Sequence, residues 1–362
     1  MIPFLDLKRQ YKTIRKKVDT AIQSVLQSQN FILGKNLELF EAEFAEYLGA
    51  KYVVGVGSGT EGLILSLRAL NVGVGDEVIT PVNSFIATSL AITEVGATPV
   101  FVDVDKDTYQ LDVRQVREKI SPKTKVILPV HLYGAPCEIR ELRKITEEKN
   151  IFLAEDACQA HGASYGEKKV GTFGDLGVFS FYPGKNLGAY GDGGAICTNN
   201  KNLYEKLIYL RNYGQSKKYF HDIIGVNSRL DEIQAAILSV KLQYLDLWNR
   251  KRREIASVYV KGMTKIKVQK IVDNSTSSYH LFVVESKDRS GLIKHLSSLG
   301  IQTLIHYPLP IHLQKCYSYL KYKKGDFPVA EKIADRILSI PIYPELTKEE
   351  VKKIIDSVNS FE

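Results

Sequence analysis

Apolar and polar positions along the chain follow two periods, and the pattern switches between them several times. Residues 11–26 and 36–48 carry apolar side chains three and four residues apart, which predicts two amphipathic helices. Short β-rich runs follow, namely "KYVVGVGSGT", "EVITP", "TPVFVDV", "KVILPVHLYG", "IFLAEDA", "DLGVFSFY" and "GAICTN". Helical segments such as "SFIATSLAITEVG" and "CEIRELRKITEEKN" separate several of these runs.

Alternating strands and helices are typical of βαβ units. They predict an α/β fold with a mostly parallel sheet that is covered by helices on both faces. Sheets of this kind bind ligands at the carboxyl ends of their strands. Side chains that come directly after a β-rich run are therefore the first candidates for a binding site.

The pattern changes near Asn227, where one long helical pattern begins and continues to residue 263. A β-rich run, "SSYHLFVVES", and two further helical segments follow it. This order predicts a second, smaller α/β domain. We expect a large domain over residues 1–240, including the N-terminal helix, and a smaller C-terminal domain over residues 241–362.

Length, charge and cysteine content narrow the class of protein. The 362 residues fit two domains, and the net charge of +8 is dispersed along the chain. This charge permits nucleic-acid binding, and a small ligand with a pyrophosphate group explains a local basic site equally well. We expect the small ligand and no nucleic acid. The N-terminal stretch has no apolar run long enough for a signal peptide or a membrane span. The four cysteines are widely spaced, which is typical of reduced thiols in a cytoplasmic protein.

A glycine-rich loop, "GVGSGTEG" at residues 55–62, follows a β-rich run and opens a helix. Backbone N–H groups at a helix N-terminus bind phosphate, so Gly59 and Thr60 are candidates for that contact. The loop lacks the Gly-Lys-Ser/Thr ending of a Walker motif, and Thr60 stands where a dinucleotide fingerprint has its third glycine. A simple tight turn is the alternative interpretation.

Asp156 ends one β-rich run, and Lys185 follows the next one within "FSFYPGKNLGAYGDGGAI". In a parallel sheet both side chains can reach the same edge. A desolvated lysine is nucleophilic toward carbonyls, and an aspartate is the partner that a pyridinium nitrogen needs. With the phosphate loop, this ordered trio predicts pyridoxal phosphate (PLP), and Phe85, just after "EVITP", is a candidate to stack on its ring.

No metal site is expected from the sequence. Asp156, Cys158 and His161 do not have the spacing of zinc ligands, and a lone histidine such as His161 is more often a packing residue. Two other classes fit less well than a PLP enzyme. A nicotinamide-dependent dehydrogenase leaves Lys185 without a role. A regulator that binds PLP or a nucleotide is the non-enzymatic alternative, and no stretch of the sequence resembles an added DNA-binding domain.

Four stretches carry a resemblance to a known family: "EDACQAHGA", "FSFYPGKNLGAYGDGGAI", "YGQSKKYFHDIIGVNSRLDEIQAAIL" and "HYPLPIHLQ". They resemble the DegT/DnrJ/StrS family of PLP-dependent nucleotide-sugar aminotransferases, over nearly the whole chain. The resemblance implies the aspartate-aminotransferase-like PLP fold (fold type I). It also implies that Lys185 bonds to the cofactor and moves the proton, while Asp156 keeps the pyridine nitrogen protonated.

The remaining cofactor contacts are likewise implied by the resemblance. Gln159 is expected at the ring hydroxyl and Phe85 over the ring, while Gly59, Thr60 and Ser180 hold the phosphate. Asn227 is expected to reach the phosphate of a neighbouring subunit, which implies a homodimer with shared active sites. In some relatives a histidine replaces the lysine and the enzyme is a dehydratase, whereas this chain has the lysine.

The family's usual amino donor is L-glutamate, and the acceptor is a nucleotide-linked keto sugar. "PVNSFIATSLAI" and "HYPLPIHLQ" are more similar to enzymes that act on 3-keto sugars. We expect a dTDP-3-keto-6-deoxyhexose as substrate, for deoxyamino-sugar biosynthesis such as that of O-antigen or another surface polysaccharide. A UDP-linked 3-keto uronic acid, with Arg229 at its carboxylate, and a 4-keto sugar are the alternatives. A structural role or a pyrophosphate contact is an equal alternative for Arg229.

Further side chains are candidates for the sugar or the pyrophosphate. Each has an alternative role as a packing group or as part of a solvated loop. The candidates are Tyr182, His306, Tyr307, Lys217, Lys218 and Tyr219.

Overall fold

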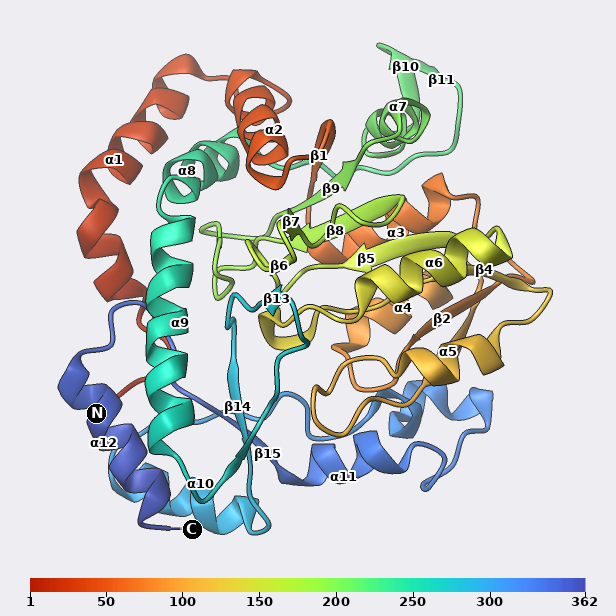
Figure 1. Cartoon of the computed structure of the whole chain (residues 1–362). Coiled ribbons are helices and arrows are strands. Elements are labelled where there is room, and N and C mark those ends of the chain that lie inside the picture. The colour runs from red at the N-terminus through yellow and green to blue at the C-terminus, as the bar shows by residue number, and fades with distance from the viewer. Residues whose placement is uncertain (362) are drawn as a thin grey trace.

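A seven-stranded sheet lies at the centre of the computed structural model, which describes residues 1–361 (Figure 1). Only β9 runs antiparallel to its neighbours in this sheet. The expectation of a mainly parallel, mixed sheet is therefore confirmed. In spatial order the strands are β1 (Tyr52–Val56), β9 (Gly194–Thr198), β8 (Leu176–Ser180), β5 (Phe152–Asp156), β4 (Thr124–Ile127), β2 (Glu77–Pro81) and β3 (Thr98–Val102).

Helices cover both faces of this sheet, as Figure 1 shows. Consecutive strand residues point to opposite faces, so Val178 packs in one apolar cluster and Phe179 in another. Because both faces are buried, the strands are almost continuously apolar. One face carries α3 (Gly59–Ala69), α4 (Ile86–Glu94) and α7 (Lys201–Leu210), and the other carries α2 (Lys35–Leu48), α5 (Val113–Lys119), α6 (Ile139–Lys149) and α8 (Glu232–Leu242).

A second, antiparallel sheet lies toward the end of the chain, with β14 between β12 and β15. Its core also includes Ile2, which pairs in parallel with Ile301, so the first residues of the chain pack with the last ones. Both termini lie at this end of the molecule (Figure 1). The elements are β12 (Lys267–Val268), β14 (Phe282–Glu285), β15 (Ile337–Ile340), α9 (Leu245–Gly262), α10 (Arg289–Ser298) and α12 (Lys348–Asn359).

The other elements connect or flank these two layers. Helix α1 (Leu7–Ser28) packs along α8, and α11 (Pro328–Arg336) lies in a shared core that also contains residues of both sheets. The short elements are β6 (Ser164–Tyr165), β7 (Lys168–Lys169), β10 (Gln215–Lys217), β11 (Phe220–His221) and β13 (Ser275–Thr276), with 3-10 turns at Leu132–Gly134, Ile311–Leu313 and Lys315–Leu320.

The long helical pattern over residues 228–263 is two helices rather than one. Helix α8 ends at Leu242 and α9 begins at Leu245. Tyr244 lies between them as the N-cap of α9, with φ −106° and ψ −9°, and its ring stacks on Trp248. Both helices bury apolar stripes, so the periodic pattern continues through the break. The expected domain boundary at residues 240/241 lies just before this break and remains a prediction.

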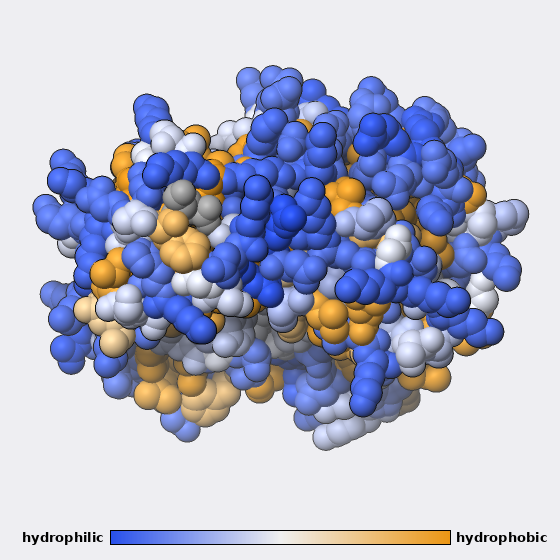
Figure 2. All heavy atoms as spheres, turned by 90° about the horizontal axis from the view of Figure 1, so that it is seen from below, coloured by the Kyte–Doolittle hydropathy of each residue, from blue (hydrophilic) through white to orange (hydrophobic). Residues whose placement is uncertain are grey.

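Polar and apolar side chains are interspersed on the face that Figure 2 shows, which is seen from below the view of Figure 1. The face formed by the C-terminal elements is mostly hydrophilic, with apolar areas separated by polar side chains (Figure 2). Within residues 1–361, every helix is too short or too polar to cross a membrane.

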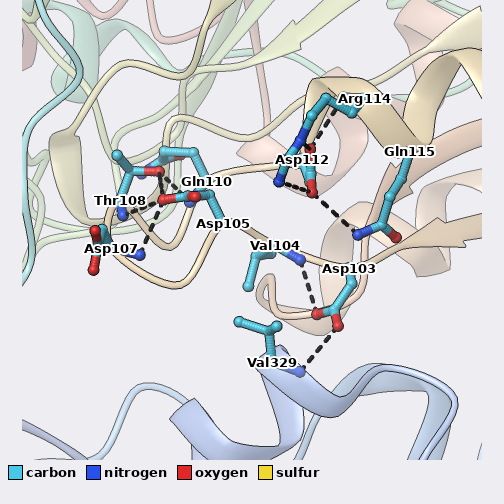
Figure 3. Close-up of polar contacts among 10 residues, drawn as sticks. All are labelled: Asp103, Val104, Asp105, Asp107, Thr108, Gln110, Asp112, Arg114, Gln115 and Val329. Carbon is cyan, nitrogen blue, oxygen red and sulfur yellow. Dashed lines mark hydrogen bonds and ion pairs between the residues drawn. The ribbon is translucent and has the colours of Figure 1, made fainter.

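Two helices of this fold have N-termini that are capped by carboxylates from distant elements. Asp103, just after β3, accepts hydrogen bonds from the N–H groups of Val329 at 3.0 Å and Ala330 at 2.8 Å, at the start of α11 (Figure 3). Glu232 of α8 is fully buried and accepts from the N–H groups of Gly34 and Leu37, at 2.8 and 3.0 Å. Each carboxylate satisfies orphan donors and fixes one helix relative to another element.

We expect Glu232→Gln to lower the free energy of unfolding by about 1–3 kcal/mol, because one charged acceptor oxygen is replaced by an amide donor that faces buried N–H groups. Urea unfolding followed by circular dichroism measures the change. Glu38→Gln is the matched control, since Glu38 lies in the first turn of α2, the helix that Glu232 caps, but is exposed. Equal losses in the two variants would contradict a specific capping role for Glu232.

Candidate active site

A cavity of about 670 Å³ opens where several strands of the large sheet end. Its wall includes Asp156 at the end of β5 and Ser180 at the end of β8. It also includes Phe4 near the N-terminus and Ile342 after β15, so the wall takes residues from nearly the whole length of the chain. This position at the carboxyl edge agrees with the expectation for an α/β sheet.

Asp156 is 5% exposed and is held by two donors. The Thr88 hydroxyl donates to Oδ2 at 2.8 Å, and the backbone N–H of Cys158 donates to Oδ1 at 3.2 Å. Ser84 is hydrogen-bonded to Thr88 in turn, at 2.5 Å between the two hydroxyl oxygens. Carboxylate oxygens each accept more than one bond, so Asp156 still has lone pairs for a cationic N–H in the cavity.

Glu155 precedes Asp156 and points to the opposite face of the sheet, where it is fully buried. Its carboxylate accepts from the N–H groups of Gly171, Phe173 and Gly174, each at 2.7 Å. The His131 ring contacts it at 2.9 Å through Nε2. These bonds fix the end of β5 and therefore the position of the Asp156 carboxylate.

The start of α3 forms another part of the wall, through Ser58, Gly59 and Thr60. The Ser58 hydroxyl caps the helix by accepting from the N–H of Glu61 at 3.1 Å. A Cβ on Gly59 would lie 2.6 Å from Cβ of Ser180 and 3.0 Å from Sγ of Cys158. Only glycine therefore allows this helix N-terminus to come so close to the end of β8.

Lys185 lies in the loop after β8, half-buried against the cavity. Burial lowers the pKa of its amine, although the nearby Cys158 and Asp156 partly oppose that shift. A lower pKa leaves more of the amine uncharged, which is the form that attacks a carbonyl. The backbone holds the loop through the N–H of Lys185, which donates to the carbonyl oxygen of Tyr182 at 2.8 Å.

Aromatic side chains flank the cavity. The rings of Phe85 and Tyr307 lie 5.5 Å apart between centroids, and Gln159 donates through Nε2 to the Tyr307 hydroxyl at 3.2 Å. Gln159 is held by its other end, where Oε1 accepts from the N–H of Tyr133 at 2.7 Å. His306 also lines the cavity, and burial together with Lys185 lowers its pKa to about 4. It is therefore a neutral imidazole near pH 7.

The structure brings most of the expected side chains to this one cavity. Those in the wall are Gly59, Thr60, Phe85, Asp156, Gln159, Ser180, Tyr182, Lys185, His306 and Tyr307. His161 is fully buried between Phe179 and Phe181 instead, and burial lowers its pKa to about 3. These two aromatic contacts and its complete burial agree with the interpretation of His161 as a packing residue. Residues 1–361 contain no cluster of three or more His, Cys, Asp or Glu side chains arranged for a metal ion.

Other expected contacts lie outside the cavity wall of this single chain. Asn227 is exposed and forms an isolated β-bridge with Asn212. Arg229 donates to Oδ1 of the same Asn212 at 3.2 Å. Lys217 and Tyr219 belong to the exposed hairpin of β10 and β11, as does Lys218, which lies beside the Tyr219 ring. Their proposed roles therefore depend on a second subunit or on movement of the hairpin, and they stay predictions.

Several residues of the cavity wall were not among the predicted ones. Ser84 and Thr88 lie four residues apart after "EVITP", a helical spacing that places them on one face, and this signal was available. Ser58 could have been predicted as an N-cap, because a serine directly before a helix commonly has that role. Arg252 and His280 come from α9 and from the segment before β14, and no local pattern connects them with Asp156 or Lys185.

Fold and cavity together define an α/β enzyme site in which a lysine and a buried aspartate share one pocket. Residues 12–359 match the model of the DegT/DnrJ/EryC1/StrS aminotransferase family. The chain belongs to this family.

The chain is similar over its whole length to curated and solved relatives. It is 48% identical to a dTDP-3-amino-3,6-dideoxy-alpha-D-galactopyranose transaminase of Aneurinibacillus thermoaerophilus, over 100% of this chain and 99% of that protein. It is 44% identical to a dTDP-3-amino-3,4,6-trideoxy-alpha-D-glucose transaminase of Streptomyces venezuelae, over 99% and 96% of the two chains.

Two crystal structures show the same fold. DesV of S. venezuelae, solved in complex with a ketimine intermediate, has a TM-score of 0.98 at 44% identity and covers 99% of this chain and 98% of its own. NtdA of Bacillus subtilis, solved with bound cofactor PMP, has a TM-score of 0.93 at 33% identity, over 99% and 84% of the two chains.

The cysteines allow a test of the electrostatics of this cavity. Burial, and then the charge of Asp156, raises the pKa of the Cys158 thiol well above its usual range, whereas Cys316 is exposed. We expect iodoacetamide at pH 8 to alkylate Cys316 at least tenfold faster than Cys158, because only the thiolate reacts. Peptide mass mapping over time measures both rates, with Cys316→Ser as the control. Alkylation of Cys158 at the rate of Cys316 would contradict the expected environment.

Proposed function

We propose that the protein transfers an amino group from L-glutamate to the C3 ketone of a dTDP-3-keto-6-deoxyhexose, giving a dTDP-3-amino-3,6-dideoxyhexose. The observation that carries the proposal is a single cavity that contains both Lys185, with its lowered pKa, and the hydrogen-bonded carboxylate of Asp156. Aminotransfer by this family uses pyridoxal phosphate as cofactor.

The residues of the cavity fit this cofactor. Asp156 has lone pairs for a pyridinium N–H, and the narrow approach between Gly59 and Ser180 leaves backbone N–H groups at the start of α3 for a phosphate. Thr60 adds a hydroxyl in the same place, and Phe85 supplies an aromatic face. We assign Gln159, already bonded to Tyr307, to the ring hydroxyl side.

When bound, pyridoxal phosphate supplies the electron sink that makes the substrate C–H bond acidic. Lys185 then removes the proton from the donor carbon and returns a proton to the sugar carbon at C3, because its amine lines the cavity and has a pKa below the usual range. Asp156 keeps the proton on the pyridine nitrogen. Thr88 and the Cys158 N–H keep Asp156 in place.

The rest of the wall orients the sugar and limits water. Tyr182 is 60% exposed at the mouth of the cavity, and His306 and Tyr307 lie deeper, where the neutral imidazole and the phenol offer hydrogen bonds to hydroxyl groups. The choice of a dTDP-linked 3-keto sugar is supported by the two dTDP-3-amino-sugar transaminases that are 48% and 44% identical. We place this step in the cytoplasm, in the supply of amino sugars for O-antigen or another surface polysaccharide.

A panel of dTDP- and UDP-linked 3-keto and 4-keto sugars tests the proposal, with L-glutamate as donor and mass spectrometry of the products. We expect the dTDP-linked 3-keto-6-deoxyhexose to have the highest kcat/KM. Lys185→Ala should lower turnover at least 10³-fold, because no other side chain replaces its proton transfer. Lys185→Arg is the matched control that keeps the charge but not the nucleophile, and it should be equally inactive.

The cofactor gives a second readout. Borohydride should fix pyridoxal phosphate to the peptide that contains Lys185 in the native protein and to no peptide in Lys185→Ala. Preference for a 4-keto sugar or for a UDP-linked uronic acid would refute the substrate assignment. Full activity of Lys185→Ala would refute the mechanism.

We also propose a homodimer with shared active sites. Support comes from the segment that follows α7, where Tyr219, Phe220 and Ile224 are 77%, 62% and 91% exposed. Apolar exposure of this size in one short segment is typical of a covered surface. Asn227, Lys217 and Tyr219 follow or belong to the same hairpin, so a partner subunit would receive them together, with Asn227 at its phosphate and Lys217 and Tyr219 near the pyrophosphate. Arg229 is assigned to the same region.

Subunit mixing tests this arrangement. Lys185→Ala and Asn227→Ala homodimers should each be impaired, and exchange between them should restore one intact site in a heterodimer. We expect activity to rise toward roughly a quarter of the native value, if half of the dimers are mixed and each has one of two sites. Verified exchange without any rise would contradict sharing, and mixing each variant with itself is the control.

A further inference from the structure

His280 lines the same cavity as Lys185, although it comes from the segment between β13 and β14. One edge of its imidazole is held inside the protein, where Nδ1 lies 3.3 Å from Oδ1 of Asn186. Asn186 follows Lys185 in the chain and is 2% exposed. The tautomer of His280 therefore depends on which way the Asn186 amide points.

Backbone carbonyls fix that amide. Nδ2 of Asn186 donates to the carbonyl oxygen of Ser278 at 2.9 Å and to Oδ1 of Asn249 at 2.8 Å. A carbonyl oxygen only accepts, so the NH₂ group must face Ser278, and Oδ1 must face His280. Asn249 is fixed in the same way, because its Nδ2 donates to the carbonyl oxygen of His161 at 2.8 Å.

The chain of bonds leaves one arrangement for the imidazole. Since Oδ1 of Asn186 has no hydrogen to give, Nδ1 of His280 must carry the proton and donate it. Burial, then the positive charges of Lys185 and Arg252, hold the pKa of His280 well below its usual range, so the ring is neutral. A neutral ring protonated at Nδ1 has a bare lone pair at Nε2. No side chain or backbone group of residues 1–361 bonds to Nε2.

A bare lone pair selects its ligand by chemistry. Phosphate, carboxylate and ketone groups are themselves acceptors and cannot bond to Nε2. A hydroxyl group can donate to it. Of the groups on a nucleotide-linked keto sugar, the sugar hydroxyls are the donors that a cavity beside Lys185 would bring within reach.

We propose that His280 is a substrate-binding residue that accepts a hydrogen bond through Nε2 from a hydroxyl of the sugar. The inference rests on the proposed function and adds to it a requirement for a donor on the sugar at this part of the wall. Asn186 and Asn249 are then positioning residues, because they set the tautomer without touching the sugar.

Two substitutions of His280 test the role of Nδ1 separately from the role of Nε2. In His280→Asn the shorter amide can still donate to Oδ1 of Asn186, but nothing replaces Nε2. In His280→Gln the longer amide can place its oxygen where Nε2 was. We expect His280→Asn to weaken the binding of the dTDP-linked amino-sugar product roughly five- to tenfold, which is the range for one lost hydrogen bond, and His280→Gln to weaken it less than about threefold.

Calorimetry on the cofactor-loaded enzyme measures the binding of the amino-sugar product and of dTDP alone, and stopped-flow absorbance measures the half-reaction with L-glutamate. We expect dTDP binding and this half-reaction to be unchanged in both variants, because neither involves the sugar. Equal weakening by Asn and Gln, or slowing of the half-reaction with L-glutamate in His280→Asn, would overturn this inference alone. A native enzyme that converts no nucleotide sugar would overturn the proposed function and this inference with it.

Discussion

Carboxylates that leave water must find donors, and in this protein the donors are mostly backbone N–H groups on other elements. Glu155 binds the loop at residues 171–174, and Glu232 binds the start of α2. Asp103 binds the start of α11 in the same way. Each of these bonds ties a segment to another that is distant in sequence, so the acids act as fixed joints of the fold. Asp156 is the exception, because its two partners leave it open to the cavity.

This difference explains how two adjacent acids of β5 have separate tasks. Side chains alternate along a strand, so Glu155 faces the interior of the protein while Asp156 faces the edge where the strands end. Both carboxylate oxygens of Glu155 have hydrogen-bond partners within the protein, and these bonds immobilise the strand. The position of Asp156 is therefore set by a neighbour that takes no part in chemistry. Lys185 lies near the carboxylate of Asp156 and near three neutral histidines. Burial and the charge of Lys185 keep the pKa of these histidines low, namely His161, His280 and His306.

The pattern of apolar positions was sufficient for the α/β class and the mostly parallel sheet, because strands buried on both faces leave short apolar runs and amphipathic helices leave a strong period. It did not predict the helices α5, α7 and α11. It could not reveal the break at Tyr244, where the apolar stripe continues through a change of direction. Within the site, Asp156, Lys185 and Gly59 follow strands and were predictable from that position. Arg252 and His280 were not, because only tertiary packing brings the C-terminal segments to the cavity. A contact with a second subunit is proposed for Asn227, Arg229 and the hairpin residues. The sequence of one chain does not show how two subunits meet.

The wall of the cavity runs from Phe4 to Ile342, and this has a consequence for how the protein matures in the cell. During synthesis the large sheet can assemble long before the second sheet has been translated, but at that stage the cavity lacks the side of its wall that holds His280, His306 and Ile342. Ile2 cannot form its β-bridge at that stage either, since its partner Ile301 is translated about 300 residues later. A nascent chain therefore has the lysine but not the enclosed pocket. The enclosed pocket forms only once the segments that carry His280, His306 and Ile342 have been made and have packed against the large sheet.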